Sequence, residues 1–245
     1  MPTRLAHLVI DAADPAWLAR FWSAALSWEV AAEKAGEVVV WPSGYDYPDP
    51  VALPLVFVPV AEPKTGKNRL HLDLATESAG HQAAEVKRLR GLGAVPADIG
   101  QGDVPWVVMA DPEGNEYCVL DPRPMYHDTG PVAAVVADCA DPAALAAFWQ
   151  IAAGWVPGDP ADGWVPLRSP HGVGPYLELL RVPGVKDVKN RIHLDVAPYA
   201  GDDHLSAVRR LREAGAVPIH IGQGEVRWAV LTDPQGGEFC VVTPR

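Results

Sequence analysis

The sequence predicts an α+β protein made of two tandem copies of one domain. The motif Asn-Arg-Leu-His-Leu-Asp at residues 68–73 returns at residues 190–195 with Ile in place of Leu. The motif Asp-Pro-Glu-Gly-Asn-Glu-Tyr-Cys-Val at residues 111–119 returns in related form at residues 233–241, at the same spacing. A repeat of this length is a whole domain. In each copy, short apolar runs alternate with helical apolar faces, which indicates mixed strands and helices.

The first copy opens with a strand followed by a helix. Residues Leu5–Ile10 form an apolar run that is typical of a strand. Asp14 and Pro15 then supply an N-cap and a proline at the first helical position. Apolar residues recur at helical spacing behind this cap and predict one buried helix face, which consists of Leu18, Phe21, Trp22, Ala25 and Leu26.

Two further strands complete the first module. They are expected at Val38–Trp41 and Leu53–Val60, on either side of a loop rich in Pro, Gly and Tyr at Pro42–Pro50. The first copy is slightly longer than the second, and the extra residues must fall in this loop. Because the loop is absent from the second copy, it is a candidate for a function that only the first copy has.

The second module repeats the same order of elements. Arg69–Ala75 is expected to be a strand, and residues 80–92 a helix that Gly93 ends. Strands are expected at Trp106–Ala110 and Glu116–Leu120, joined by a type I turn with Asp first, Pro second and Gly fourth. Each copy therefore consists of two strand-helix-strand-strand-strand (βαβββ) modules, and the chain holds four such modules.

Composition sets the domain boundaries and excludes several classes of function. The segment between the copies is rich in Pro, so we expect domains at 1–121 and 132–245 with a linker at 122–131. A net charge of −11 argues against a nucleic-acid partner. No apolar run is long enough for a membrane span, and no signal-peptide pattern is present. Three cysteines argue against a disulfide framework, so we expect a cytoplasmic protein.

The paired βαβββ modules, the strand-borne His-Leu-Asp and the final Asp-Pro-x-Gly-x-Glu hairpin resemble the vicinal-oxygen-chelate superfamily. That group includes glyoxalase I, bleomycin-resistance proteins and extradiol dioxygenases. The resemblance is greatest to its tandem glyoxalase-like branch and covers the whole chain outside the linker. It implies two glyoxalase-like domains, in each of which two modules form a cupped mixed sheet with helices outside.

The resemblance also implies where a metal would bind. Superfamily ligands come from the first and fourth strand of each module and point into the cup. In the first copy these positions are His7, a residue near Val56, His71 and Glu116. His7, His71 and Glu116 form a two-histidine, one-carboxylate set that suits a divalent ion such as Fe, Mn, Zn or Ni.

The second copy has Ala134 where His7 stands in the first copy, so it is expected to be degenerate. A weaker second set there consists of Glu178, His193 and Glu238. The His and Glu that both copies keep are equally consistent with a structural hydrogen bond. Two other residues recur beside them. Asp73 and Asp195 either cap a loop or act as a base near the cup, and the recurrence of Cys118 and Cys240 is attributed to packing.

Two functions are consistent with these residues. In the first, the chain is a metal-dependent enzyme, dioxygenase-like or lyase-like, which converts a small oxygen-chelating molecule in domain 1. In the second, it is a metal-free binding protein of the bleomycin-resistance type. Trp41, Tyr45 and Tyr47 lie on or beside the inserted loop and are expected to stack on a flat ligand in either case. The two copies are expected to form a pseudo-dimer within one chain or to take part in a homodimer.

Overall fold

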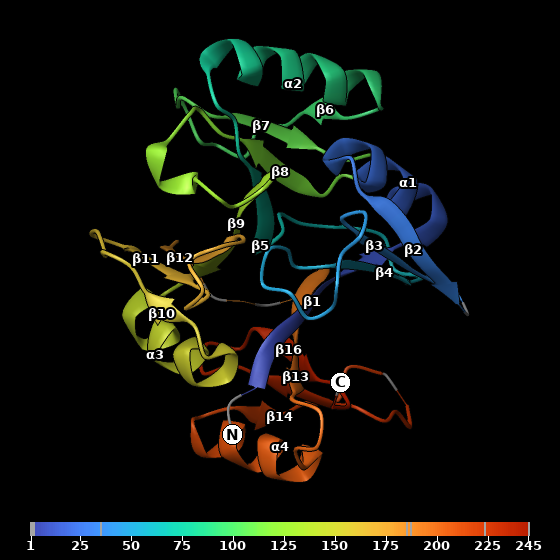
Figure 1. Cartoon of the computed structure of the whole chain (residues 1–245), viewed down its shortest axis with the longest axis vertical. Coiled ribbons are helices and arrows are strands. Elements are labelled where there is room, and N and C mark those ends of the chain that lie inside the picture. The colour runs from blue at the N-terminus through green and yellow to red at the C-terminus, as the bar shows by residue number, and fades with distance from the viewer. Residues whose placement is uncertain (1–2, 35, 185, 187, 223, 245) are drawn as a thin grey trace.

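A computed structural model describes residues 3–34, 36–184, 186, 188–222 and 224–244, and these residues form the four expected modules (Figure 1). The first module contains β1 (Thr3–Ala12), α1 (Pro15–Leu26), β2 (Glu29–Lys34), β3 (Glu37–Trp41) and β4 (Leu55–Pro59). The second contains β5 (Leu70–Leu74), α2 (Ala79–Gly91), β6 (Val95–Pro96), β7 (Val107–Ala110) and β8 (Glu116–Val119). A short 3-10 helix, η1 (Pro124–Tyr126), lies in the linker.

The second half repeats this order of elements. The third module contains β9 (Val132–Cys139), α3 (Pro142–Ala153), β10 (Val156–Pro157), β11 (Trp164–Arg168) and β12 (Tyr176–Arg181). The fourth contains β13 (Ile192–Pro198), α4 (His204–Glu213), β14 (Val217–Pro218), β15 (Ala229–Thr232) and β16 (Glu238–Val241). The predicted α+β class and the four βαβββ modules are confirmed. In the described part of the chain, no helix is both long and apolar enough to cross a membrane.

The modules pair across the two halves of the chain. Sheet A has the strand order β14-β15-β16-β13-β1-β4-β3-β2, and sheet B has the order β10-β11-β12-β9-β5-β8-β7-β6. The first module therefore shares a sheet with the fourth, and the second with the third. We expected each copy to close its own sheet. The repeat could not distinguish the two arrangements, because both copies carry the same strand edges.

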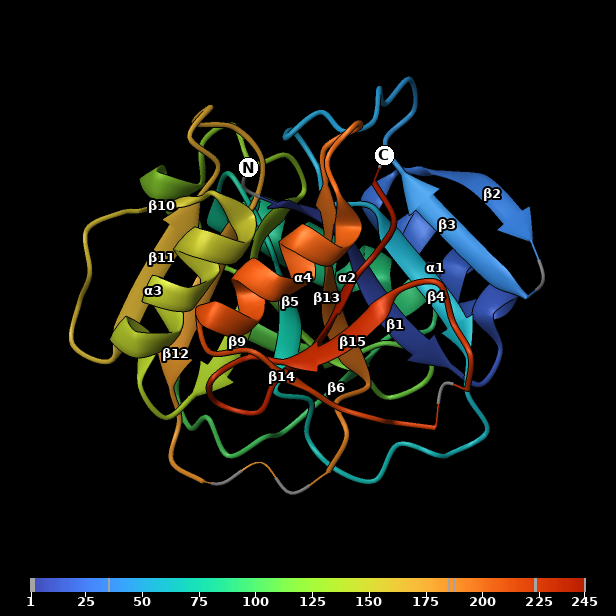
Figure 2. The same ribbon diagram turned by 90° about the horizontal axis from the view of Figure 1, so that it is seen from below.

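Each sheet packs against the helices with only one of its two faces. On β1, Leu8 and Ile10 belong to the hydrophobic core together with Leu18 and Trp22 of α1. Because side chains alternate along a strand, His7 and Val9 lie on the opposite, concave face. The four helices cover the outside of the sheets: they lie around the periphery in Figure 1, and in Figure 2 α4 lies in front of the strands and α2 behind them.

Local signals in the sequence place the helices as expected. The Asp14 side chain accepts a hydrogen bond from the Trp17 N–H at 2.9 Å, which confirms the predicted N-cap of α1. The indole N–H of the buried Trp22 donates to Asp111 in the hairpin turn of the second module, at 3.1 Å. Gly93 follows α2 with φ +111, a left-handed conformation that favours glycine.

Charged residues fasten the paired modules at the strand ends. Lys67, just before β5, forms an ion pair with Asp138 of β9, and Arg69 donates to the Asp138 carbonyl at 3.0 Å. In the second copy, Lys189 forms the equivalent ion pair with Asp11 of β1, and Arg191 donates to the Asp11 carbonyl at 2.9 Å. We call each group of Lys, Arg and Asp a cross-module clamp. The recurrence of the motif around residues 67–73 therefore has a structural reason in both copies.

Removing the charge of a clamp aspartate should destabilise the fold. We expect Asp138→Asn and Asp11→Asn each to lower the free energy of unfolding by about 1–3 kcal/mol, because each buried aspartate loses the charge that holds its lysine. Urea unfolding followed by circular dichroism would measure this loss. Asp162→Asn is the matched control: Asp162 is fully exposed and faces Arg181 at 3.6 Å. A control as destabilised as the clamp variants would contradict the role of the clamps.

Candidate functional site

The concave face of each sheet carries a group of His, Asp and Cys side chains. In sheet B the group consists of His71, Asp73 and Cys118, and in sheet A of His193, Asp195 and Cys240. In each group the candidate ligand atoms lie within 4.8 Å of one another. The strand register produces this arrangement, since Asp73 pairs with Cys118 and Asp195 with Cys240 on parallel neighbouring strands.

Sheet A adds a fourth donor from the other half of the chain. His7 of β1 lies opposite Asp195 of β13, and its Nδ1 is 3.6 Å from the Asp195 Oδ2. The other carboxylate oxygen, Oδ1, is 3.6 Å from the His193 Nε2. The Cys240 Sγ is also 3.6 Å from the His193 Nε2. Asp195 thus lies between two imidazoles, and a thiol completes the group.

Burial controls the protonation of this group. Desolvation lowers the pKa of His193, so its imidazole is neutral and can act as a ligand. Desolvation, with the nearby Asp195 carboxylate, raises the pKa of the Cys240 thiol well above its usual range. The Asp195 Oδ1 is buried and has no hydrogen-bond partner among the described residues. A buried carboxylate oxygen in this situation is costly unless a cation binds it, so the group fits a metal ion.

The first predicted set of ligands is divided between the sheets. His7 lies in sheet A, whereas His71 and Glu116 lie in sheet B. Glu116 is also engaged elsewhere, because its carboxylate accepts from the Lys64 Nζ at 2.7 Å and from the Asn68 N–H at 3.1 Å. This corrects the expected convergence of the three residues. The cause is the pairing of modules across the halves.

The second predicted set is divided as well. Glu178 lies in sheet B, and His193 and Glu238 lie in sheet A. The Glu238 carboxylate is paired with the Lys186 Nζ at 2.5 Å and accepts from the Asn190 N–H at 3.3 Å. The two glutamates that follow the hairpin turns, Glu116 and Glu238, therefore hold the loops before β5 and β13.

Sequence analysis missed the ligating roles open to Asp195 and Cys240. Both residues recur in the other copy as Asp73 and Cys118, and each shares a strand face with a predicted ligand, His193 or Glu238. That recurrence on one face was the available signal. Packing and loop capping also explain recurrence, so the signal could not be interpreted without the register between β13 and β16.

The linker fills the concave face of sheet B. The Tyr126 hydroxyl donates to the Glu178 carboxylate at 2.9 Å, and the Trp164 indole donates to the same carboxylate at 3.0 Å. Tyr126 packs edge-on against Tyr176, with ring centroids 5.9 Å apart, and clusters with Cys118. Burial raises the pKa of Glu178. The chain itself therefore occupies the concave face of sheet B.

The inserted loop lies over the concave face of sheet A. The ring of Tyr47 stacks on His7 with centroids 5.9 Å apart. Tyr45 contacts both Tyr47, at 6.4 Å, and Trp41, at 5.7 Å, between ring centroids. The Tyr45 hydroxyl donates to the Asp49 carbonyl within the loop at 2.8 Å. The three aromatic residues expected to contact a ligand form one cluster beside His7, and their role in binding stays a prediction.

Paired βαβββ modules, with His at matched positions of adjoining first strands, define the vicinal-oxygen-chelate fold. The chain belongs to the glyoxalase-like domain family, whose model matches residues 7–120 and 134–242. Glyoxalase I from Zea mays superposes with a TM-score of 0.67 at 14% identity, over 98% of this chain and 92% of that one. A putative dioxygenase from Bacillus subtilis gives 0.64 at 13% identity, over 99% and 86%. No curated protein sequence matches the chain. At these identities the likeness shows the fold alone.

The buried Glu178 should make stability depend on pH. The folded-state pKa of this carboxyl is raised above the ordinary 4.5, so the folded chain binds more protons than the unfolded chain between the two values. Stability from this group is therefore lost as pH rises from about 4.5 to the folded pKa. Glu178→Gln removes the titration and keeps an acceptor for Tyr126.

Relative to the unsubstituted chain, the free energy of unfolding of Glu178→Gln should therefore increase as pH rises above about 4.5. Urea titrations at several pH values would measure this difference. Glu238→Gln is the comparison, because its carboxylate is paired with Lys186. If the difference in free energy of unfolding between Glu178→Gln and the unsubstituted chain did not change with pH, the raised pKa of Glu178 would be contradicted.

Proposed function

We propose that the concave face of sheet A is a metal-dependent site for a small oxygen-chelating molecule. The observation that carries this proposal is that His7 lies beside Asp195, whose buried Oδ1 lacks a hydrogen-bond partner within the described residues; the equivalent Asp73 Oδ1 of sheet B also lacks one, but it lies opposite Ala134. The Asp195 Oδ1 lies beside His193, and the other oxygen of the same carboxylate lies beside His7. The Cys240 Sγ lies within 4.8 Å of the candidate ligand atoms of His193 and Asp195.

The donor set indicates which metals suit the site. His7, His193, Asp195 and Cys240 would hold a divalent ion through two imidazoles, one carboxylate and one thiolate. A thiolate favours Zn, Ni or Fe over Mn among the metals expected from the sequence. The two anionic ligands would balance the charge of the ion. When bound, the ion would act as a Lewis acid that polarises substrate oxygens.

Apolar residues of the first module flank this group. Val56 of β4 lies in register with Val9 of β1, and both are apolar. The fourth-strand position of the first module therefore supplies no ligand, and an apolar substrate body can pack there. The Tyr47 hydroxyl is buried without a hydrogen-bond partner in the described part of the chain. We assign it the role of donor to a substrate oxygen.

Asp195 would also orient the two imidazoles of the site. Its carboxylate lies between the His7 and His193 rings, and the lowered pKa of His193 keeps that ring neutral. The aromatic loop over His7 would exclude water from the same space, which strengthens electrostatic interactions there. These features suit a lyase-like or dioxygenase-like reaction, in keeping with the activities named for the solved structures of similar fold.

Sheet A is preferred over sheet B for two reasons. Ala134 stands opposite Asp73 in sheet B, where sheet A has His7 opposite Asp195. In addition, Tyr126 and Glu178 fill the concave face of sheet B. The proposed site is composite, since His7 comes from the first half and the other donors from the second. This differs from the expectation that domain 1 alone would hold it.

Metal content should depend on sheet A and not on sheet B. We expect protein purified without chelators and loaded with Zn²⁺ to retain one ion. His193→Ala and Cys240→Ser should weaken its binding by roughly 100-fold or more. The equivalent changes in the other sheet, His71→Ala and Cys118→Ser, are matched controls and should retain the ion. Elemental analysis after dialysis measures the content.

Cobalt substitution gives a second readout of the same site. A thiolate-to-cobalt absorption band should appear on titration and be lost in Cys240→Ser. If neither zinc nor cobalt binds, the metal proposal is wrong. The function would then be metal-free binding of a small molecule beside Trp41, Tyr45 and Tyr47.

Removal of the Tyr47 hydroxyl should separate binding from stability. With the zinc-loaded protein we expect Tyr47→Phe to lower the affinity for tropolone, a flat chelating probe, by about tenfold. This is the effect expected from the loss of one hydrogen bond. The free energy of unfolding should not fall, because the hydroxyl has no partner to lose. Tyr45→Phe is the control, since its hydroxyl bonds only its own loop, and it should keep the affinity within about twofold. Calorimetric titration would measure the tropolone affinity of both variants. An equal loss of affinity in Tyr45→Phe and Tyr47→Phe would contradict the role of Tyr47.

A further inference from the structure

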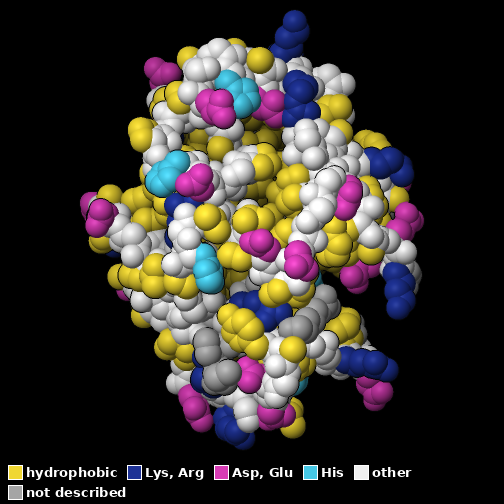
Figure 3. All heavy atoms as spheres, in the orientation of Figure 1, with side chains coloured by type: hydrophobic (Ala, Val, Ile, Leu, Met, Phe, Trp, Pro, Cys, Tyr) yellow, Lys and Arg dark blue, Asp and Glu magenta, His cyan; other side chains and the backbone are white. Residues whose placement is uncertain are grey.

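A large cavity lies outside both concave faces. It has a volume of about 820 Å³ and is bounded by the end of α1, by α2 and by the linker. Figure 3 shows it as a hollow below α2 with hydrophobic atoms on its floor and charged and His side chains around its rim. This volume falls within the range of sites for small organic molecules.

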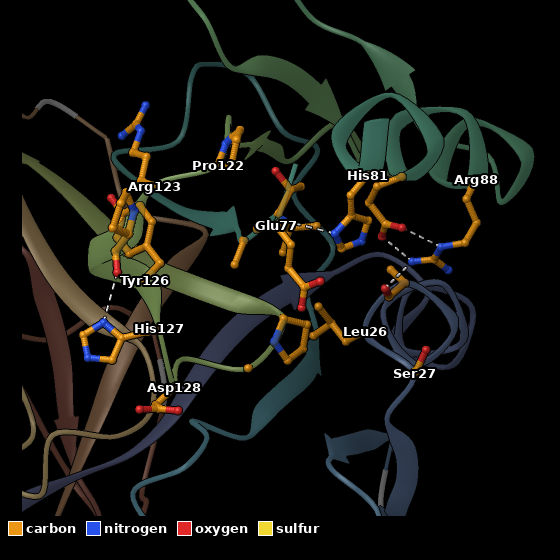
Figure 4. Close-up of a pocket in the computed structure, with 18 residues that line it drawn as sticks. Leu26, Ser27, Glu77, His81, Arg88, Pro122, Arg123, Tyr126, His127 and Asp128 are labelled. Carbon is orange, nitrogen blue, oxygen red and sulfur yellow. Dashed lines mark hydrogen bonds and ion pairs between the residues drawn. The ribbon is translucent and has the colours of Figure 1, made fainter. Parts of the chain in front are cut away.

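The floor of the cavity is apolar. Leu26 at the end of α1, Leu74 at the end of β5 and Tyr126 of the linker are buried and line it, and prolines of the linker extend it (Figure 4). The floor belongs to three segments that are far apart in the sequence. A flat or compact apolar group could bury most of its surface here.

The two guanidinium groups at the rim are already neutralised. Arg88 donates to Glu85 on its own helix and to the Ala24 and Ala25 carbonyls at the end of α1, at 2.9 and 2.6 Å. Arg123 donates to Asp121 at 2.8 Å. Each of these cations is bound to a carboxylate, so neither offers a free positive charge to a ligand.

Two carboxylates at the rim are not neutralised. Glu77 and Asp128 are exposed and extend from opposite walls of the cavity, the loop after β5 and the linker (Figure 4). Neither side chain has an ion pair or a hydrogen bond with the residues that the structure describes. The Nδ1 of His81 accepts from the Glu77 N–H at 3.2 Å, which leaves Nε2 as the donor of the neutral ring.

We propose that this cavity binds an amphipathic organic cation. The apolar body would lie on the Leu26, Leu74 and Tyr126 floor, and the ammonium group would lie at the rim between Glu77 and Asp128. Apolar burial supplies affinity, and the uncompensated negative charge selects a cation over an anion. The proposal is independent of the metal site, because no residue of that site lines the cavity.

Three probes with one shared phenyl group test the proposal: benzyltrimethylammonium, benzyl alcohol and phenylacetate. We expect one molecule of the cation to bind per chain, about tenfold or more tighter than the neutral probe, with phenylacetate the weakest. Calorimetric titration of the full chain measures the affinities. Resonances of His81 and His127, assigned with His81→Gln and His127→Gln, should shift with the cation and so locate it at this rim.

Charge removal at the rim provides the decisive comparison. Glu77→Gln and Asp128→Asn should each lower the affinity for benzyltrimethylammonium by about fivefold and leave the affinity for benzyl alcohol unchanged. Glu213→Gln with Glu225→Gln, two exposed carboxylates of the second half, is the control for net charge and should have no effect. A chelator should also have no effect. Equal affinity for all three probes, no binding of the cation, or indifference to both rim variants would overturn the proposal.

Discussion

The antiparallel pairing of first strands across the two halves is the constraint on which the rest of the structure depends. β1 pairs with β13, and β5 pairs with β9, so each eight-stranded sheet is continuous only when both halves are present. Strand pairing alone does not specify the partner. The cross-module clamps fix the register at the strand ends, where Lys67 meets Asp138 and Lys189 meets Asp11, but both copies carry them, so they do not choose the partner module either. Partly buried charges of this kind are stabilising only with their partners in place, which favours one register over its neighbours.

The candidate site follows from that pairing. His7 comes close to Asp195 because β1 and β13 are neighbours, and the parallel pairing of β13 with β16 brings Cys240 beside Asp195. No donor is carried by a flexible loop, so the four side chains are held by strands whose other face is packed into the core. Such rigid support is what a metal or substrate site requires.

Sequence analysis predicted the modules and several of their details, including the Asp14 cap, the helix face with Trp22, and Gly93 after α2. These features depend on local chemistry that neighbouring residues encode. The pairing of modules is a long-range choice, and both copies present the same edges and the same clamp residues, so the sequence permits either solution. If each copy closed its own sheet, His7 and His71 would lie in the same sheet. Cys240 and Asp195 are repeated in the sequence, but packing and loop capping are sufficient explanations for repeated residues when the strand register is not known.

The linker has a consequence for how such a protein can diverge. Two identical subunits related by a two-fold axis have identical sites, and every mutation changes both. A fused chain has a single tether, and the tether can lie at only one of the two equivalent places. Here it inserts Tyr126 against Glu178 on one side and leaves the other sheet without an equivalent plug of linker residues. Fusion therefore breaks the symmetry by geometry alone, before any substitution accumulates. The two sheets of one chain can then diverge separately.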